Sequence, residues 1–264
     1  MTKDTKAVKL WPFNVPNTAM SFAINLIPKI RIALLSLCLF VSSVFLSWVT
    51  FAQFDFAYPS LYYVMSIDKH IHKYGPQNKY KKGFELTNKP EQVRLFSAIN
   101  HSIHNQGQGL NKITFHNPQG QPINRLLRNP EVIHLKDVAN LIDTFYMVSY
   151  ICLFSFLALL AYLKASNIQL PSIKQQAIGI LSFSALCLIA VMVIGPITVF
   201  YALHEWVFPQ NHQWFFYYQE SLMTVLMKAP YLFGAIAGLI AILAIGIYLV
   251  INWLVQTYLI KSAK

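Results

Sequence analysis

The sequence predicts an all-α membrane protein with four transmembrane helices and a small α+β extracytoplasmic cap between the first and second spans. Of its 264 residues, 55% are hydrophobic and only 12% are charged, whereas a soluble domain carries about 25% charged residues. Four stretches are long and apolar enough to cross a bilayer core, which requires about 20 residues of helix. A long polar segment separates the first of these stretches from the other three.

The predicted spans divide the chain into nine segments. The spans are residues 32–54, 144–163, 177–203 and 231–260. The segments between and around them are a cytoplasmic or interfacial N-terminal segment (1–31), the cap with the entry to the second helix (55–143), a cytoplasmic loop (164–176), an outer loop rich in aromatic residues and histidine (204–230) and a cytoplasmic tail (261–264). The long basic leader and the length of the first apolar run favour a retained span over a cleaved signal peptide.

The distribution of Lys and Arg predicts that both termini face the cytoplasm. Positive charges flank the spans in 1–31, 164–176 and the tail, while the competing 204–230 loop carries only Lys228. The eleven Lys and Arg of 55–143 do not oppose this orientation, because such a long loop is translocated largely regardless of its charge. We therefore expect a multi-pass protein of the cell (inner, cytoplasmic) membrane. The net charge of +11 is attributed to topology and anionic lipid headgroups, and no nucleic-acid partner is expected.

Two local patterns predict structure inside the cap. Residues 88–105 are expected to form a helix with Asn88 as its N-cap. Residues 110–127 are expected to form a hairpin that turns at the sequence NPQG. The cap also holds His70, His72, His101, His104 and His116. Without cysteines, an HExxH motif or a clear third ligand, these histidines are interpreted as a solvated face rather than a metal site.

A third helix is expected to begin at Asn129 and continue without a break into the second span. Pro130 suits the first helical turn, and the carboxylate of Glu131 complements the helix dipole there. Spacings of three, three and four residues place a polar series roughly on one side of this helix: His134, Asp137, Asn140 and Thr144. Polar groups that approach lipid must face protein or a wet cavity. A hydrogen-bond ladder between packed helices remains the alternative to a functional site.

The candidate chemistry is concentrated in the two outward-facing segments. They hold all eight histidines and nine of the ten acidic residues. His134 lies near Asp137, and His204 is followed by Glu205, so two imidazoles beside carboxylates are expected at one membrane level. A carboxylate can fix the tautomer of a histidine and raise its basicity, which suits a general base. No GxSxG motif accompanies them, so no covalent acyl-enzyme is expected.

These residues resemble the four-span family of lipoprotein intramolecular transacylases. The family pattern E-x-x-H-[ML]-x-D-V corresponds here to Glu131, His134, Leu135, Asp137 and Val138. A second pattern of a histidine, x-x-x-F and a later W-x-F corresponds to His204, Phe208, Trp214 and Phe216, with Pro230 further on. The resemblance covers roughly residues 30–260. The chain departs from the pattern at Tyr217 and Tyr218, where the family usually has an acidic residue and proline.

The resemblance implies a reaction, a substrate and a set of site residues. A diacylglyceryl-modified lipoprotein would transfer its sn-2 acyl chain to the amine of its N-terminal cysteine, giving a lyso-form lipoprotein. No cofactor and no metal are implied, and membrane phospholipid is the surrounding partner. His134 and His204 would share acid/base catalysis. The supporting residues would be Asp137, Glu205, Asn211 and Trp214, with Phe208, Phe216 and Asn140 in the substrate pocket.

Two other classes of function fit part of the sequence. A non-catalytic membrane adaptor that docks headgroups or a protein partner would explain the charge and the four spans. It would not explain two histidine–carboxylate pairs at one depth. A metal site built from His134, His204 and His212 would explain the histidines.

Overall fold

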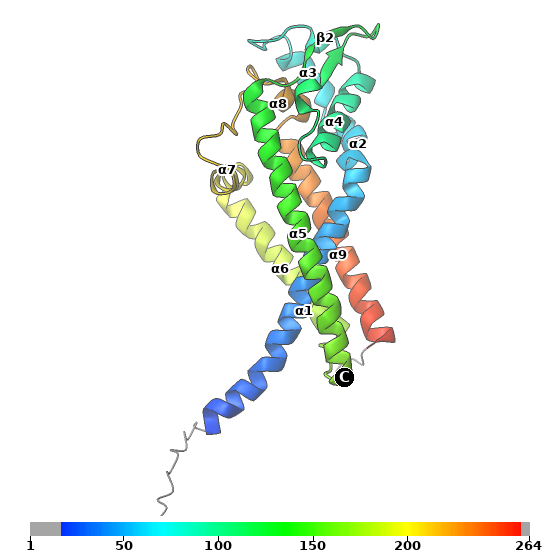
Figure 1. Ribbon diagram of the computed structural model, residues 1–264, viewed down its shortest axis with the longest axis vertical. Coiled ribbons are helices and arrows are strands. Elements are labelled where there is room, and N and C mark those ends of the chain that lie inside the picture. The colour runs from blue at the N-terminus through cyan, green and yellow to red at the C-terminus, as the bar shows by residue number, and fades with distance from the viewer. Residues whose placement is uncertain (1–16, 260–264) are drawn as a thin grey trace, which may run out of the picture.

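The computed structural model describes residues 17–259 and is mostly helical. Four helices are long and apolar enough to cross a membrane: α1 (Asn17–Gln53), α5 (Asn129–Ala165), α6 (Ile173–Ile194) and α9 (Tyr231–Tyr258). Helix α1 packs against both α5 and α9, while α6 contacts α9 and leans away from the bundle toward the cap end (Figure 1). The first half of the expected interfacial segment (1–16) and the tail (261–264) lie outside the described residues.

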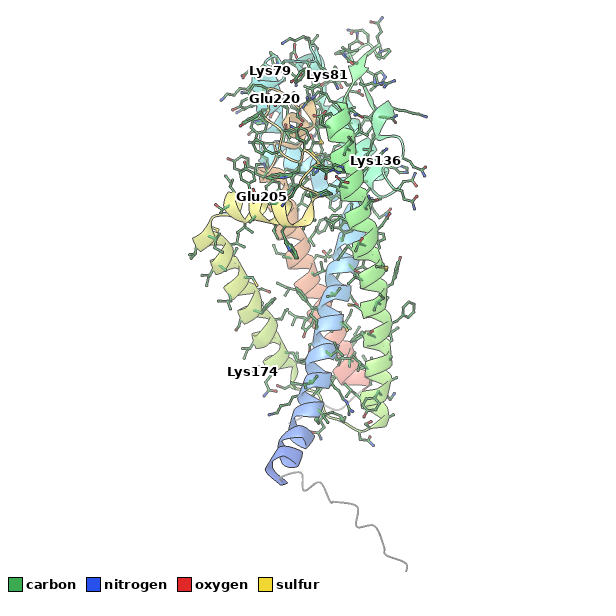
Figure 2. All side chains as sticks on the ribbon, turned by 60° about the vertical axis from the view of Figure 1, so that its left-hand side comes forward. Lys79, Lys81, Lys136, Lys174, Glu205 and Glu220 are labelled. Atoms are coloured by element: carbon green, nitrogen blue, oxygen red, sulfur yellow. The ribbon has the colours of Figure 1, made fainter. Side chains whose placement is uncertain are left out.

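The apolar stretch 177–203, expected as a single helix, is two helices. Helix α6 ends at Ile194, Gly195 follows with φ +98°, and α7 (Pro196–Val207) begins with proline at its first position. Glycine adopts this backbone conformation without strain, and proline interrupts a helix because it lacks an N–H and its ring clashes with the preceding turn. Figure 2 shows α7 running across the upper end of α6, beneath the cap. His204 therefore lies on a separate helix.

The segment between α1 and α5 folds as a small α+β unit at one end of the bundle (Figure 1). Its elements are η1 (Asp55–Ala57), α2 (Tyr58–Val64), α3 (Ile67–Tyr74), η2 (Phe84–Leu86), α4 (Lys89–Ile103), η3 (Leu110–Lys112), β1 (Thr114–His116) and β2 (Pro122–Arg125). The expected helix and hairpin are both confirmed. Asn88 caps α4 by accepting the N–H of Glu91 at 3.1 Å, and β1 pairs antiparallel with β2.

One apolar core joins this cap to a helix far along the chain, α8 (Leu222–Met227). All six residues of α8 are buried, and its neighbours include α3 and α4. Tyr58 is fully buried, stacks on Phe96 with ring centroids 4.1 Å apart, and donates its hydroxyl to the carbonyl of Leu226 at 2.9 Å. The segment that carries α8 is thus part of the cap fold, although it lies far from the cap in sequence.

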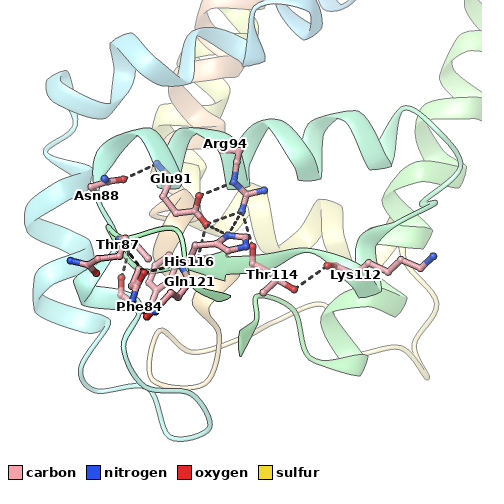
Figure 3. Close-up of polar contacts among 11 residues, drawn as sticks. Phe84, Thr87, Asn88, Glu91, Arg94, Lys112, Thr114, His116 and Gln121 are labelled. Carbon is pink, nitrogen blue, oxygen red and sulfur yellow. Dashed lines mark hydrogen bonds and ion pairs between the residues drawn. The ribbon is translucent and has the colours of Figure 1, made fainter. Parts of the chain in front are cut away.

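A charged cluster holds the hairpin on α4 (Figure 3). Arg94 Nε donates to Glu91 Oε2 at 2.7 Å, and the backbone N–H of His116 donates to Glu91 Oε1 at 2.8 Å. Arg94 Nη2 also donates to the carbonyl of Thr114 at 2.7 Å. Burial alone would raise the pKa of Glu91, but hydrogen bonds from Arg94 and His116 outweigh burial and lower the pKa to about 2.

The low pKa of Glu91 predicts a pH-dependent contribution to stability. Its folded-state pKa of about 2 lies below the ordinary value of 4.5, so the stabilisation is complete above the ordinary value and is lost as the pH falls through the folded one. Glu91→Gln should therefore lower the thermal midpoint in detergent at neutral pH, and the gap from wild type should narrow as the medium is acidified. A gap that does not change with pH would contradict the role assigned to the carboxylate.

The interpretation of the cap histidines as a solvated face is wrong for His70 and His104. His70 is 9% exposed and packs between the rings of Tyr74 and Tyr218, with centroids 4.6 and 4.5 Å away. Burial, followed by the charges of nearby lysines, lowers the pKa of His70 to about 4. His104 Nε2 accepts the indole N–H of Trp48 at 3.0 Å. Both histidines are held by packing contacts because the cap folds back on other segments. His104 contacts α1, and His70 contacts the 218–227 region.

Candidate active site

A cavity of about 710 Å³ lies where the cap meets the membrane helices. Its walls come from α1, α4, α5, α7, α8, α9 and the loop between α7 and α8, and they are largely apolar. Polar side chains enter at few points, among them His134, His204, Asn100 and Thr224. A mostly apolar cavity with a few convergent polar groups is typical of a small-molecule or lipid site.

The two histidines expected to react lie together in this cavity. The ring centroids of His134 and His204 are 6.2 Å apart. His134 is 8% exposed, and its Nδ1 has no hydrogen-bond partner among the described atoms. Two imidazoles at this separation can both reach one reacting group placed between them.

Helix α7 determines the tautomer of neutral His204. Its Nδ1 lies 2.8 Å from the carbonyl oxygen of Phe200, and since a carbonyl only accepts, Nδ1 must carry the proton. Nε2 then holds a lone pair. Burial lowers the pKa of His204, and the hydrogen bond to Phe200 only partly opposes this. The lowered pKa favours the neutral imidazole, in which Nε2 is the nitrogen with a free lone pair.

The predicted aromatic residues surround both imidazoles. Phe208 packs edge-on to His134 with ring centroids 4.9 Å apart. Phe216 is 6.1 Å from His134, and Trp214 is 5.2 Å from His204. All three residues line the cavity. The loop that follows α7 thus supplies a wall of the site.

The expected carboxylate partners do not contact these histidines. Glu205 is exposed on α7 and forms no ion pair or hydrogen bond within the described part of the chain (Figure 2). Neighbouring residues on a helix point about 100° apart, so Glu205 turns away when His204 faces the cavity. Asp137 binds a different histidine: His212 Nδ1 is 2.7 Å from Asp137 Oδ2. Asp137 was expected to orient His134, but the hydrogen bond that the structure shows for its side chain is to His212.

Two further expected residues lie outside the cavity. Asn140 is exposed and absent from the cavity wall. The hydroxyl of Thr144 donates to the carbonyl of Asn140 at 2.9 Å, so the last polar side chain of the series on α5 is satisfied within its own helix. Asn211 is also exposed and does not line the cavity.

The sequence matches a known family over most of its length. The model of the family described as lipoprotein intramolecular transacylase Lit matches residues 29–233. The chain belongs to the Lit family. Membership of this family supports acyltransferase activity of the lipoprotein intramolecular transacylase type. The four apolar helices agree with a multi-pass membrane protein.

Solved structures of Lit from Bacillus cereus share the fold. One, with a histidine-to-arginine substitution, has a TM-score of 0.62 at 14% identity and covers 91% of this chain and 95% of that chain. Another has a TM-score of 0.61 at 15% identity, covering 88% of this chain and 96% of that chain. At such identities the likeness concerns the fold. No curated protein matches the sequence.

The candidate site also contains residues that the sequence patterns did not indicate. Phe200 lies 3.9 Å from the ring of His204, measured between centroids, and its position one helical turn before that histidine was a usable signal. Asn100, Thr224 and Ile236 come from the cap, α8 and α9. No local pattern links these three to the histidines, because only the packing of distant segments brings them together.

The described residues of this Lit-family chain contain no cluster of ligands that would support the metal-site hypothesis. Within residues 17–259, no group of three or more His, Cys, Asp or Glu side chains is placed to hold a metal ion. His212, the third ligand of that hypothesis, is engaged by Asp137.

Proposed function

We propose that this Lit-family protein moves the sn-2 acyl chain of a diacylglyceryl-cysteine lipoprotein to the N-terminal amine of the same molecule, with His134 and His204 as the acid/base pair. One observation carries the proposal. Two imidazoles with centroids 6.2 Å apart line an apolar cavity of about 710 Å³ at the junction of cap and membrane helices. An acyl chain requires the apolar walls, and the proton transfers require the imidazoles.

The chemistry needs no nucleophile from the protein. The neutral amine attacks the sn-2 ester carbon, a C–N bond forms, and the carbonyl electrons move to the oxygen. The intermediate then collapses, the C–O bond to glycerol breaks, and the departing alkoxide takes a proton. Starting from the ammonium form, the reaction releases one net proton. Because amine and ester belong to one molecule, holding them together supplies much of the rate.

The tautomer of His204 suggests how the proton transfers are divided. Its Nδ1–H is committed to Phe200, so Nε2 is the proposed base that takes a proton from the amine. His134 is the proposed donor to the departing sn-2 oxygen, and the proton that His204 took from the amine replaces the one that His134 gives up, so both imidazoles return to their starting state. Each transfer is worth about 10²–10⁴-fold in rate. The indole N–H of Trp214, beside His204, is the proposed donor to the oxyanion.

We place the cap and the cavity at the outer face of the cytoplasmic membrane, with both termini in the cytoplasm. The Lys/Arg distribution supports this orientation. Lys174, in the first turn of α6, lies at the opposite end of the molecule from the cap residues Lys79 and Lys81 (Figure 2). Substrate lipid would then reach the cavity from the outer leaflet.

Cysteine labelling of intact cells is expected to confirm this topology. In a background with the three native cysteines replaced, a membrane-impermeant thiol reagent should modify a cysteine at Asn117 or Gln210 and spare one at Asn167. Permeabilised cells should allow labelling at all three positions. Labelling of Asn167 alone in intact cells would reverse the orientation and with it the placement of the site.

Mass spectrometry of lipoprotein N-termini tests the activity. Purified protein and a synthetic diacylglyceryl lipopeptide should yield an isomer of unchanged mass whose fragments carry an acyl group on nitrogen and a free glycerol hydroxyl. Cells that express the protein should contain lyso-form lipoproteins that cells without it lack. An unmodified lipopeptide after incubation with folded protein would refute the proposal.

A further inference from the structure

A hydrogen bond between a histidine and a carboxylate ties the loop between α7 and α8 to the helix that carries His134. His212 Nδ1, in the loop, is 2.7 Å from Asp137 Oδ2, on α5, across 75 positions of sequence. The side chains are 34% and 15% exposed, so solvent screens the pair less than it would on an open surface. Since a carboxylate only accepts, His212 donates the proton of its Nδ1.

The loop that this pair holds, residues 208–221, has little structure of its own. It contains turns but no helix or strand. Around His212, the contacts within the loop are few: its N–H donates to the carbonyl of Pro209 at 3.0 Å, and Gln213 Nε2 donates to the carbonyl of Phe215 at 3.0 Å. The position of this stretch therefore depends on contacts with other elements.

The same loop carries the aromatic wall of the cavity. Phe208 and Phe216 pack on His134, and Trp214 packs on His204. His212 lies between Phe208 and Trp214 in sequence, and its partner Asp137 lies one helical turn beyond His134 on α5. Near its other end the loop is held by an ion pair, Glu220 with Lys79 at 3.0 Å.

We propose that His212 is a positioning residue for acyl transfer. Its hydrogen bond to Asp137 holds loop 208–221 against α5, so that the aromatic wall closes around His134 and His204. The carboxylate of Asp137 then acts on the site through the loop, and not by orienting His134. The inference rests on the proposed function for its kinetic consequence, although the tether itself is a property of the fold.

Kinetics with a diacylglyceryl lipopeptide test the positioning role. His212→Ala should lower kcat/KM on the order of ten-fold, because misplacing a site wall by about 1 Å can cost more than this. His212→Asn should recover most of the loss, since the Asn side-chain N–H can occupy the place of Nδ1–H. Asp137→Ala should match His212→Ala, and the double variant should be no worse than either, because the two residues form one interaction.

Hydrogen exchange separates the tether from the chemistry. In His212→Ala and in Asp137→Ala, residues 208–221 should exchange faster than in wild type, whatever the substrate of the enzyme. The matched control is His116→Ala, which removes another His–carboxylate pair, Glu91 with His116 at 2.9 Å, away from the cavity (Figure 3). That variant should leave both the exchange of 208–221 and kcat/KM unchanged.

The outcomes distinguish the two proposals. An unchanged hydrogen-exchange rate in residues 208–221 would overturn the role of His212. Losses of kcat/KM that add up in the double variant would overturn it as well. Faster exchange together with wild-type kcat/KM would likewise show that the tether does not position the site. Wild-type protein that fails to convert the lipopeptide would overturn the proposed function, while the exchange data would still report on the tether.

Discussion

His134→Ala and His204→Ala are each expected to lower acyl transfer by about 10²–10⁴-fold, because each removes a group that moves a proton at the ester. If the two imidazoles act as one unit, the double variant should be little worse than either single variant. The measurement is the rate of conversion of a diacylglyceryl lipopeptide to its lyso, N-acyl form, with substrate in excess.

His72 offers a matched control for these substitutions. It is an exposed cap histidine whose Nδ1 bonds only the backbone of its own helix, so His72→Ala should keep near wild-type activity. Thermal midpoints in detergent should show that all variants are folded. Near-normal conversion by a folded His134→Ala or His204→Ala protein would refute the two-histidine mechanism.

Tyr58→Ala is expected to destabilise the protein by about 3–5 kcal/mol, the usual cost of removing a large buried aromatic ring. Tyr58 is fully buried and stacks on Phe96. Its hydroxyl binds the carbonyl of Leu226, on α8, so the ring also links the cap to the segment that closes the cavity. Reversible unfolding in detergent, or the shift of the thermal midpoint, measures the loss.

Two further variants show how much of the loss is due to the buried ring. Tyr58→Phe tests the hydroxyl alone, and Tyr63→Ala is a control on the same helix. Tyr58→Phe keeps the ring and should cost only about 1–3 kcal/mol, for a buried carbonyl left without its donor. Tyr63, on the same helix α2, is 68% exposed, so Tyr63→Ala should change stability little. If Tyr58→Ala and Tyr63→Ala lowered the free energy of unfolding equally, the stability of the cap core would not depend on Tyr58.

Local patterns in the sequence were sufficient to predict most of the fold and the proximity of the two candidate histidines. The apolar stretches, the N-cap Asn88, the hairpin at NPQG and the unbroken helix from Asn129 all depend on residues close together in the chain, and all are present in the structure. His134 and His204 were predicted to converge because two adjacent spans bring them to the same level, and their rings are 6.2 Å apart.

The partners of these residues were decided only by tertiary structure. The break between α6 and α7 is an exception, because it follows from the local backbone properties of Gly195 and Pro196. Asp137 is close to His134 in sequence but binds His212, since the direction of a carboxylate depends on which loop packs against its helix. His70 was predicted to be exposed and is buried by Tyr218. Contacts between segments far apart in the chain leave no periodic signal in either segment. Sequence patterns therefore locate the candidate side chains, and the packing selects what each of them contacts.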